Sequence, residues 1–360
     1  MALPSAPLLH VPGLQAGLQF SKLSARRRTT LENQGEIGEA LVRPRGDNGV
    51  VPEECHVDVR FFAPPPEFDG CFTTFYRATF TMPGGGTVTD HLQPEWANLR
   101  VFSQDLPRSN MIGGSTVEGA RLLVTGPSSV PNRFEIASTR MWGIGLLPLG
   151  WARFVRLQAA DHANLLAEVE KHPAFTRFAS LSNIFANDPD DEAELAQLIA
   201  FFRSIDEPCG DTDTITLVHG ALVDPEVANV AELSKRSGLS VRVLERVCRR
   251  HFGFPPKLLL RRQRFMRTLA TFMLAEQGQW KAAIDEHYHD HAHFTRDFRA
   301  FMHMTPSEYA ALPHPVLSAF MAERKRMWGS PAQTLDKPEG ALNVRGALDS
   351  GHAAPSSSAI

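Results

Sequence analysis

Cysteine is scarce in this sequence, and long apolar runs are missing. The 360 residues include four cysteines, which lie far apart and form no C-x-x-C motif: Cys55, Cys71, Cys209 and Cys248. This spacing argues against a disulfide framework or a zinc module and suits a reducing cytosol. No apolar run reaches the roughly 18 residues that a membrane-spanning helix needs. Residues 1–20 lack a basic start and a continuous apolar core, so they make a poor signal peptide, and we expect a cytoplasmic protein without a membrane partner.

Sequence signatures of catalysis are also absent. The chain contains no G-x-S-x-G, no Walker A motif and no strand-placed G-x-G-x-x-G. The three glycines at 84–86 follow Pro83 and indicate a hairpin loop rather than a phosphate cradle. We therefore expect no catalytic residue, no cofactor, no metal site and no enzyme activity.

Positive charge is concentrated in one segment of an otherwise acidic chain. Residues 235–267 carry eleven Lys or Arg against the single acidic residue Glu245, a net charge of +10, whereas the whole chain carries −3 and the remainder therefore −13. Such a block is typical of a surface that binds a polyanion. A solvated helix face is the alternative interpretation of the same composition.

The pattern along the chain predicts an α+β protein. Short β-branched and aromatic runs between 56 and 150, separated by Gly and Pro, indicate six strands of a barrel or sandwich. Helical patterns follow at 162–172 and 190–205, with Asp190 or Asp191 as cap of the second. We predict four regions: a disordered or loosely packed segment 1–50, a β-rich regulatory domain with a helical C-terminal part 51–222, an all-α domain 223–315, and a disordered tail 330–360.

The all-α region contains two copies of one plan, each a short helix, a turn and a second helix. In the first copy Val230, Ala231 and Leu233 are predicted to point inward, Gly238 forms the turn and Ser240 caps the second helix. The second helix has two faces. Its apolar side collects Leu244, Val247, Cys248 and Phe252, and the opposite side collects Arg242, Arg246 and Arg249.

The second copy includes the histidine-rich stretch HYHDHAHF, 287–294. Trp280, Ala283 and Ile284 are predicted to lie on the inner face of its first helix, with a turn at 287–289 and a cap at Asp290. Phe294, Phe298 and Phe301 then form the apolar stripe of the second helix, with His291 on the side nearer to it and Ala292, Arg296, Arg299 and His303 opposite. Residues 257–277 contain no internal Gly or Pro and are predicted to form a linker helix of about 30 Å. Because neighbouring major grooves on one side of DNA lie about 34 Å apart, this linker suits two reading helices one duplex turn apart.

Residues 226–312 resemble the DNA-binding domain of AraC/XylS-family transcriptional regulators. The resemblance is carried by VAELSKRSGLSVRVLERVCRRHFG, PKLLLRRQRF, Trp280, AHFTRDFRAF and TPSEY. It implies a bacterial transcription regulator with two helix-turn-helix units and a linker helix. By position, the base-reading residues would be Arg242, Glu245 and Arg246 in the first unit and His291, Ala292 and Arg296 in the second, and the resemblance places Thr295 and Arg299 near phosphate. Arg249 lies in the same exposed stripe and completes the predicted DNA-binding set. Where the family usually has glycine, in the second turn and near the end of the last reading helix, this sequence has His287 and His303.

Other interpretations of these residues remain open. The pairs His287/His291 and His289/His293 have the i, i+4 spacing of a helical zinc or nickel site, but two of these residues precede the predicted cap. The same histidines near DNA suggest a hypothesis of pH-sensitive binding. The front domain is expected to sense an unidentified small effector or to dimerise, with Trp96, Phe102, Trp142, Trp151 and Phe154 as candidate lining residues.

The expected partners are double-stranded promoter DNA, RNA polymerase, a small effector and a second copy of the chain. A non-catalytic protein whose basic helical face docks an acidic protein is the alternative function.

Overall fold

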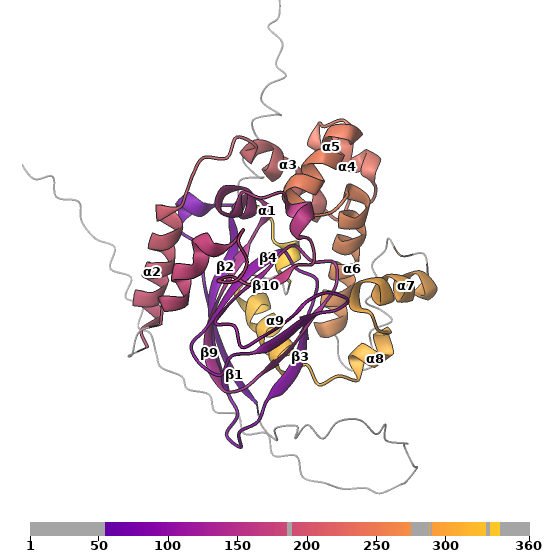
Figure 1. The fold of residues 1–360 in the computed structure, drawn as a ribbon. Coiled ribbons are helices and arrows are strands. Elements are labelled where there is room, and N and C mark those ends of the chain that lie inside the picture. The colour runs from indigo at the N-terminus through magenta and orange to yellow at the C-terminus, as the bar shows by residue number, and fades with distance from the viewer. Residues whose placement is uncertain (1–54, 186–188, 275–287, 289, 329–331, 339–360) are drawn as a thin grey trace, which may run out of the picture. The chain divides into compact units, whose positions relative to one another are not determined.

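The computed structural model describes residues 55–185, 189–274, 288, 290–328 and 332–338 (Figure 1). The described residues all belong to one compact unit. The segment 1–50, for which the sequence predicts disorder, lies outside the described residues. Among the helices that are described, none combines the length and the apolar character needed to cross a bilayer.

The N-terminal part is a pair of antiparallel sheets. A six-stranded sheet has the order β1-β2-β9-β4-β7-β10, and a four-stranded sheet has the order β3-β8-β5-β6. The described strands are β1 (His56–Phe62), β2 (Phe72–Thr81), β3 (Val88–Leu92), β4 (Ala97–Phe102), β5 (Arg108–Met111), β6 (Thr116–Glu118), β7 (Leu122–Thr125), β8 (Asn132–Ile136), β9 (Thr139–Leu146) and β10 (Leu166–Glu168). The six predicted strands are confirmed, while the sequence pattern missed the short strands β3, β5, β6 and β10.

The inner strands of the six-stranded sheet are buried on both faces. Along β7, Leu122 and Val124 belong to one apolar cluster, and Leu123, which points the other way, belongs to a second. The first cluster lies under the helices that follow β9, and the second lies between the two sheets. Since successive side chains of a strand point to opposite faces, burial of both faces explains why β2, β4 and β7 are buried at nearly every position rather than at alternate ones.

The predicted helix at 162–172 is wrong. Its first residue, His162, ends a 3-10 turn (Ala159–His162), and Leu166–Glu168 form β10, which pairs with β7 at the sheet edge. An isolated helix of eleven residues is marginal in water. Pairing with β7 buries Leu166 to 1% exposure, which a sequence period does not reveal.

The helices of the remaining part follow local sequence features. Asp190 caps α2 by accepting hydrogen bonds from the backbone N–H groups of Glu192 and Ala193, which confirms one of the two predicted caps. The described α-helices are α1 (Pro148–Gly150), α2 (Asp191–Ser204), α3 (Thr212–Val223), α4 (Val230–Ser237), α5 (Val241–Val247), α6 (Pro256–Leu274), α7 (His291–Met302), α8 (Pro306–Ala310) and α9 (Pro315–Trp328). The fold is thus an antiparallel β part followed by a helical part, the α+β class that the sequence predicts.

The chain returns to the β part after the helix-turn-helix region. Helix α9 packs against β1 and β3, and the buried carboxylate of Asp90 in β3 accepts hydrogen bonds from the backbone N–H groups of Val316 and Leu317 at 3.0 and 2.8 Å. Beyond α9, Thr334 is fully buried and its carbonyl accepts a hydrogen bond from Gln263 in α6. The predicted disordered tail from residue 330 is therefore wrong for 332–338, because tertiary contacts hold this polar stretch; 339–360 lies outside the described residues.

Candidate functional site

The first helix-turn-helix consists of α4 and α5. Asn229 caps α4, Gly238 ends it with a φ of 69°, and Ser240 caps α5 by accepting a hydrogen bond from the N–H of Val243. Helix α5 continues as a π-helical turn (Cys248–Phe252), and Gly253 ends it with a φ of 85°. The predicted cap Ser240, the turn at Gly238 and the apolar face of α5 are confirmed, with one correction. Ala231 is exposed rather than inward-facing, and Leu233 and Ser237 form the buried side of α4.

The second reading helix is α7. Asp290 caps it by accepting a hydrogen bond from the N–H of His293 at 2.7 Å, as the sequence predicts. Phe294, Phe298 and Phe301 are each at most 1% exposed and pack on α6. His303 ends the helix with a φ of 56°, so a histidine adopts the left-handed conformation usually taken by glycine. The predicted first helix of this unit, with Trp280, Ala283, Ile284 and the turn at His287, lies outside the described residues.

The two reading helices expose the same positions. The burial patterns of residues 241–250 and 291–300 are identical, so each residue of α5 has an equivalent fifty positions later in α7. Arg246 corresponds to Arg296, and Arg249 corresponds to Arg299; all four are exposed. The helix ends also correspond, since Gly253 and His303 are both left-handed. The chain thus presents two copies of one surface.

Most of the predicted DNA-contacting side chains lie on these exposed faces. The exposed members are Arg242, Arg246, Arg249, His291, Ala292, Arg296 and Arg299. Glu245 and Thr295 are half-buried at equivalent positions, and Glu245 accepts a hydrogen bond from Arg249 at 2.9 Å. His291 is exposed and does not lie toward the apolar side, because its position directly after the cap places it in the open first turn.

The basic block is not one solvent-facing surface. Arg262 of α6 is fully buried, with its guanidinium carbon 3.9 Å from the centre of the Trp96 ring and a hydrogen bond of 2.9 Å to the carbonyl of Ser128. Burial lowers the pKa of Arg262 to about 9. This cation therefore joins the linker helix to the β part instead of facing a polyanion.

His219 of α3 lies in the same junction. Its ring centre is 5.6 Å from that of Trp96 and 6.2 Å from that of Phe252 at the end of the first reading helix. Burial, together with the positive charge of Arg262, lowers the pKa of His219 to about 3. With this lowered pKa the ring is neutral at neutral pH. Within the described residues its Nε2 atom has no hydrogen-bond partner.

The junction should therefore be acid-sensitive. The folded pKa of His219, about 3, is below the unfolded value near 6.5, so its contribution to stability is complete above pH 6.5 and is lost as the pH falls toward 3. From pH 7.5 to pH 5 we expect wild-type protein to lose about 2 kcal/mol more unfolding free energy than His219→Phe, measured by urea denaturation. His56→Gln, on the exposed side of β1, should behave as wild type. Equal pH dependence of wild type and His219→Phe would contradict the assignment.

A cationic groove lies between α4, α6 and α7, and the sequence analysis did not single it out. Its lining residues are Ala228, Asn229, Val230, Lys257, Leu260, Arg261, Arg264, His293, Arg296 and Asp297. Three of its cations follow the i, i+4, i+7 spacing on α6, a helical stripe that could have been found from the sequence.

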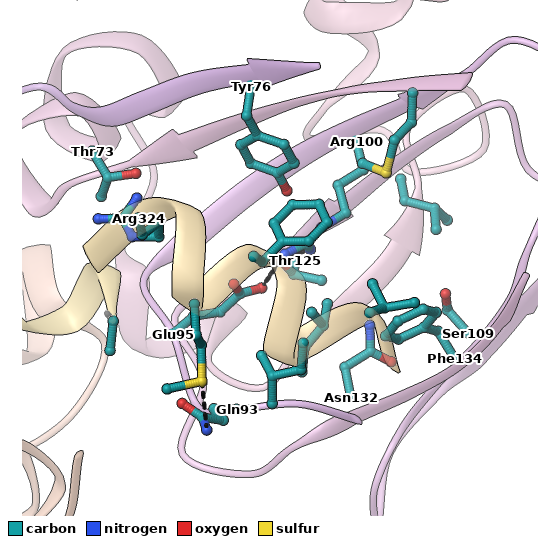
Figure 2. A pocket seen from close by; sticks show the side chains of 18 of the residues that line it. Thr73, Tyr76, Gln93, Glu95, Arg100, Ser109, Thr125, Asn132, Phe134 and Arg324 are labelled. Carbon is teal, nitrogen blue, oxygen red and sulfur yellow. Dashed lines mark hydrogen bonds and ion pairs between the residues drawn. The ribbon is translucent and has the colours of Figure 1, made fainter. Parts of the chain in front are cut away.

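The β part contains a cavity of about 120 Å³ between the two sheets, closed by α9 and by Met266 of α6 (Figure 2). Figure 2 shows Asn132, Ser109 and Phe134 gathered at one end of it, and Arg324 and Thr73 at the other. Most of its lining is apolar. The Oδ1 atom of Asn132 has no hydrogen-bond partner among the described residues.

Each of the two arginines at the cavity forms an ion pair with a carboxylate of the protein. Arg100 donates to Glu95 at 2.6 Å, and Arg324 donates to Asp336 at 2.6 Å. Burial raises the pKa of Asp336 to about 6, although Arg324 acts in the opposite direction. The cavity is therefore mainly apolar, with paired charges at its wall, and Asn132 Oδ1 and Thr334 Oγ1 have no hydrogen-bond partner among the described residues.

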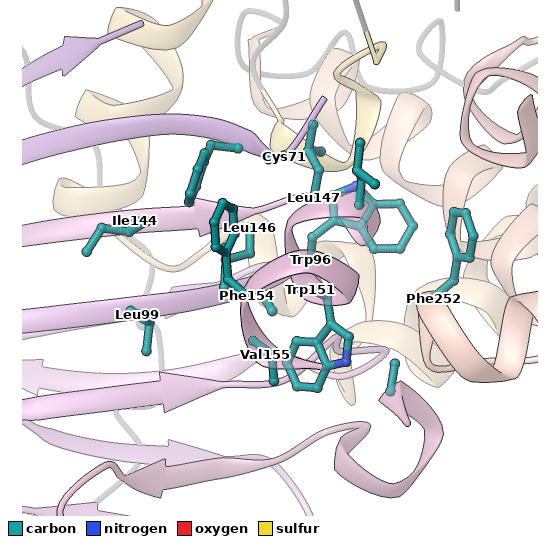
Figure 3. Packing of buried hydrophobic residues seen from close by; sticks show 14 of the residues in the cluster. Cys71, Trp96, Leu99, Ile144, Leu146, Leu147, Trp151, Phe154, Val155 and Phe252 are labelled. Carbon is teal, nitrogen blue, oxygen red and sulfur yellow. The ribbon is translucent and has the colours of Figure 1, made fainter. Parts of the chain in front are cut away.

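Of the five aromatic residues predicted to line a ligand site, Phe102 lines the cavity. The other four, Trp96, Trp142, Trp151 and Phe154, belong to the apolar cluster on the opposite face of the six-stranded sheet. Figure 3 shows Trp96, Trp151 and Phe154 packed with Leu146 and Leu147 there. Sequence alone could not separate the two faces because both are apolar.

Only part of the histidine cluster is described. His287 and His289 lie outside the described residues, so the i, i+4 pairs of the predicted metal alternative cannot be placed. Across the described part of the chain, no group of three or more His, Cys, Asp or Glu residues has the arrangement of a metal site.

Comparison with known proteins identifies the helical part. Residues 233–311 match the family model of a helix-turn-helix domain. No curated protein gives a significant match. Among solved structures, ToxT from Vibrio cholerae is similar at 12% identity and a TM-score of 0.37, covering 71% of this chain and 98% of ToxT. A ToxT structure with a bound unsaturated fatty acid matches at 13% identity and a TM-score of 0.35, covering 71% of this chain and 94% of that one.

The fold and the paired helices define a DNA-binding protein of the helix-turn-helix class. More narrowly, the chain carries an AraC-type helix-turn-helix domain, the DNA-binding module of transcription regulators. Such a module binds DNA.

Proposed function

We propose that the protein regulates transcription by placing α5 and α7 in neighbouring major grooves of promoter DNA, under the control of a small molecule bound in its β part. The supporting observation is the repeated surface, in which Arg246 and Arg296 occupy equivalent exposed positions of two capped helices. A major groove about 12 Å wide admits one helix, and arginine can pair with guanine O6 and N7 or neutralise phosphate.

The 19 residues of α6 connect the two units (Figure 1). At 1.5 Å per residue this helix is about 28 Å long, which is comparable with the 34 Å between neighbouring major grooves. In this proposal the bases are contacted by Arg242, Glu245, Arg246, His291, Ala292 and Arg296. Thr295 and Arg299 contact phosphates, and Arg249 lies in the same DNA-facing stripe as Arg242 and Arg246.

Binding to the DNA upstream of the protein's own gene tests this function. We expect a gel shift with a protected region spanning two major grooves and an affinity that falls steeply with salt. A protein that docks an acidic protein partner instead would give no protected region on any genomic fragment. Genome-wide recovery of bound DNA then identifies the target promoters.

The cavity is the proposed effector site. An engineered apolar cavity of about 150 Å³ binds benzene, so a volume of about 120 Å³ suits a molecule near that size. Because Arg100 and Arg324 are each matched by a carboxylate, an uncharged molecule fits best, with one hydrogen-bond donor directed at Asn132. Since α9 and Met266 close the cavity, occupancy would act on both the C-terminal helix and the linker helix.

Filling the cavity should remove ligand binding without removing DNA binding. Ser109 is 3% exposed and lines the cavity, so Ser109→Leu occupies its space. With phenol as probe at about ten times its dissociation constant, we expect the melting temperature of wild type to rise by about 3 °C, from a stabilisation near 1.4 kcal/mol. Ser109→Leu should show no rise and should keep its DNA affinity within about threefold. Ser109→Ala leaves the cavity open and should respond as wild type; an equal rise in wild type and Ser109→Leu would place phenol elsewhere.

A further inference from the structure

The groove between the two helix-turn-helix units has an unusual charge balance. Lys257, Arg261 and Arg264 of α6 and Arg296 of α7 line it, and among the described lining residues Asp297 is the one carboxylate. Four cations around one anion leave a net charge of +3 without counting His293. Like charges gathered in one concave surface repel each other, and a bound anion relieves that repulsion.

Asp297 fixes two of these cations in place. It accepts hydrogen bonds from Arg261 at 2.6 Å and from Arg264 at 2.9 Å, and its side chain is 2% exposed. Burial would raise the pKa of Asp297, but the hydrogen bonds from Arg261 and Arg264 outweigh it and hold the pKa below its usual range. The carboxylate therefore stays ionised, joins α6 to α7, and orients two guanidinium groups in the groove wall.

Lys257 and Arg296 supply the exposed charge of the groove. Lys257 lies in the first turn of α6, where its flexible ammonium acts as a point charge, and Arg296 lies on the reading face of α7. The groove is therefore continuous with the face of the second reading helix, and it also touches Asn229, at the start of the first unit.

We infer that this groove binds a backbone phosphate of DNA between the two major grooves, with Lys257 as its main exposed contact. The inference rests on the proposed function. Two reading helices in neighbouring major grooves enclose the minor groove between them, together with the two phosphate strands at its edges. The connector between the helices must face these strands. A stripe of cations at 257, 261 and 264 on that connector is complementary in charge to these strands.

The test measures how binding of wild type and Lys257→Gln depends on salt, by fluorescence anisotropy on target DNA and on random DNA. Each neutralised phosphate contributes about 0.9 to the slope of log affinity against log salt, so the slope should fall by about 0.9 in the variant. At 0.1 M salt this corresponds to roughly eightfold weaker binding, equal on both DNAs, because a phosphate contact carries no sequence information. Lys257→Arg should restore the slope, and Lys171→Gln, at an exposed lysine of the β part, should leave it unchanged.

Other outcomes separate this inference from its alternatives. If Lys257→Gln keeps the wild-type slope while Arg246→Ala loses specific binding, the groove inference is wrong and the regulator function stands. If inorganic phosphate stabilises wild type but not Lys257→Gln at constant ionic strength, and the slope is unchanged, the groove binds a free anion instead of DNA. If wild type binds no DNA at all, the proposed function itself fails.

Discussion

Replacing Arg246 and Arg296 together with alanine should lower specific DNA affinity by about 2–6 kcal/mol, or roughly 30-fold to more than 10⁴-fold. Each arginine is exposed at the equivalent position of its reading helix. Loss of one bidentate contact to a guanine costs about 1–3 kcal/mol, and effects at separated sites add. Anisotropy titrations on target and random DNA should show that target binding falls more than random binding.

The single variants divide this effect between the two units. Arg246→Ala should relax specificity in one half of the protected region, and Arg296→Ala in the other half. Arg108→Ala removes an exposed arginine of β5 and should leave affinity unchanged. An unchanged footprint and affinity in the double variant would refute the assignment of both residues.

Phe298→Ala should destabilise the second helix-turn-helix unit by about 3–5 kcal/mol, the usual cost of truncating a buried phenylalanine. Phe298 is fully buried, and its ring centre lies 5.4 Å from that of Phe265 and 5.5 Å from those of Phe294 and Tyr309. The ring therefore joins α7 to both α6 and the segment that follows. Urea unfolding followed by circular dichroism measures the loss.

The equivalent position in the first unit provides the matched control. Cys248 lies fifty residues before Phe298 and is also fully buried. Cys248→Ala removes one heavy atom rather than a ring, and we expect it to cost about 1 kcal/mol. Comparable losses in the two variants would show that Phe298 is not the centre of its cluster.

The reading helices were predictable because their features are local. Ser240 and Asp290 satisfy N–H groups within three residues of themselves, and the apolar stripes repeat at helical spacing. The positive φ at Gly238 follows from the same kind of short-range requirement. Because such interactions need no distant partner, the sequence contains them completely.

Which cations of the basic block 235–267 stay exposed was not predictable in the same way. Eleven cations in 33 residues indicate a polyanion site, yet Arg262 is buried on Trp96, 166 positions earlier in the chain. Arg261 and Arg264, its neighbours, are bound by Asp297 from α7. A charge count gives the total, whereas the folded chain determines which charges remain available.

By itself, the sequence determined the α+β class, the two capped reading helices and most of the residues on their outer faces, since these depend on periodicity and contacts within a few residues. Only the tertiary structure decided that Leu166 pairs at a sheet edge and that Phe102, but not Trp142, lines the cavity. It also brought α9 back over the β part, with Asp90 at the helix start. Each of these contacts joins residues far apart in the chain. The apolar or charged character of one residue does not determine which distant residue it will contact.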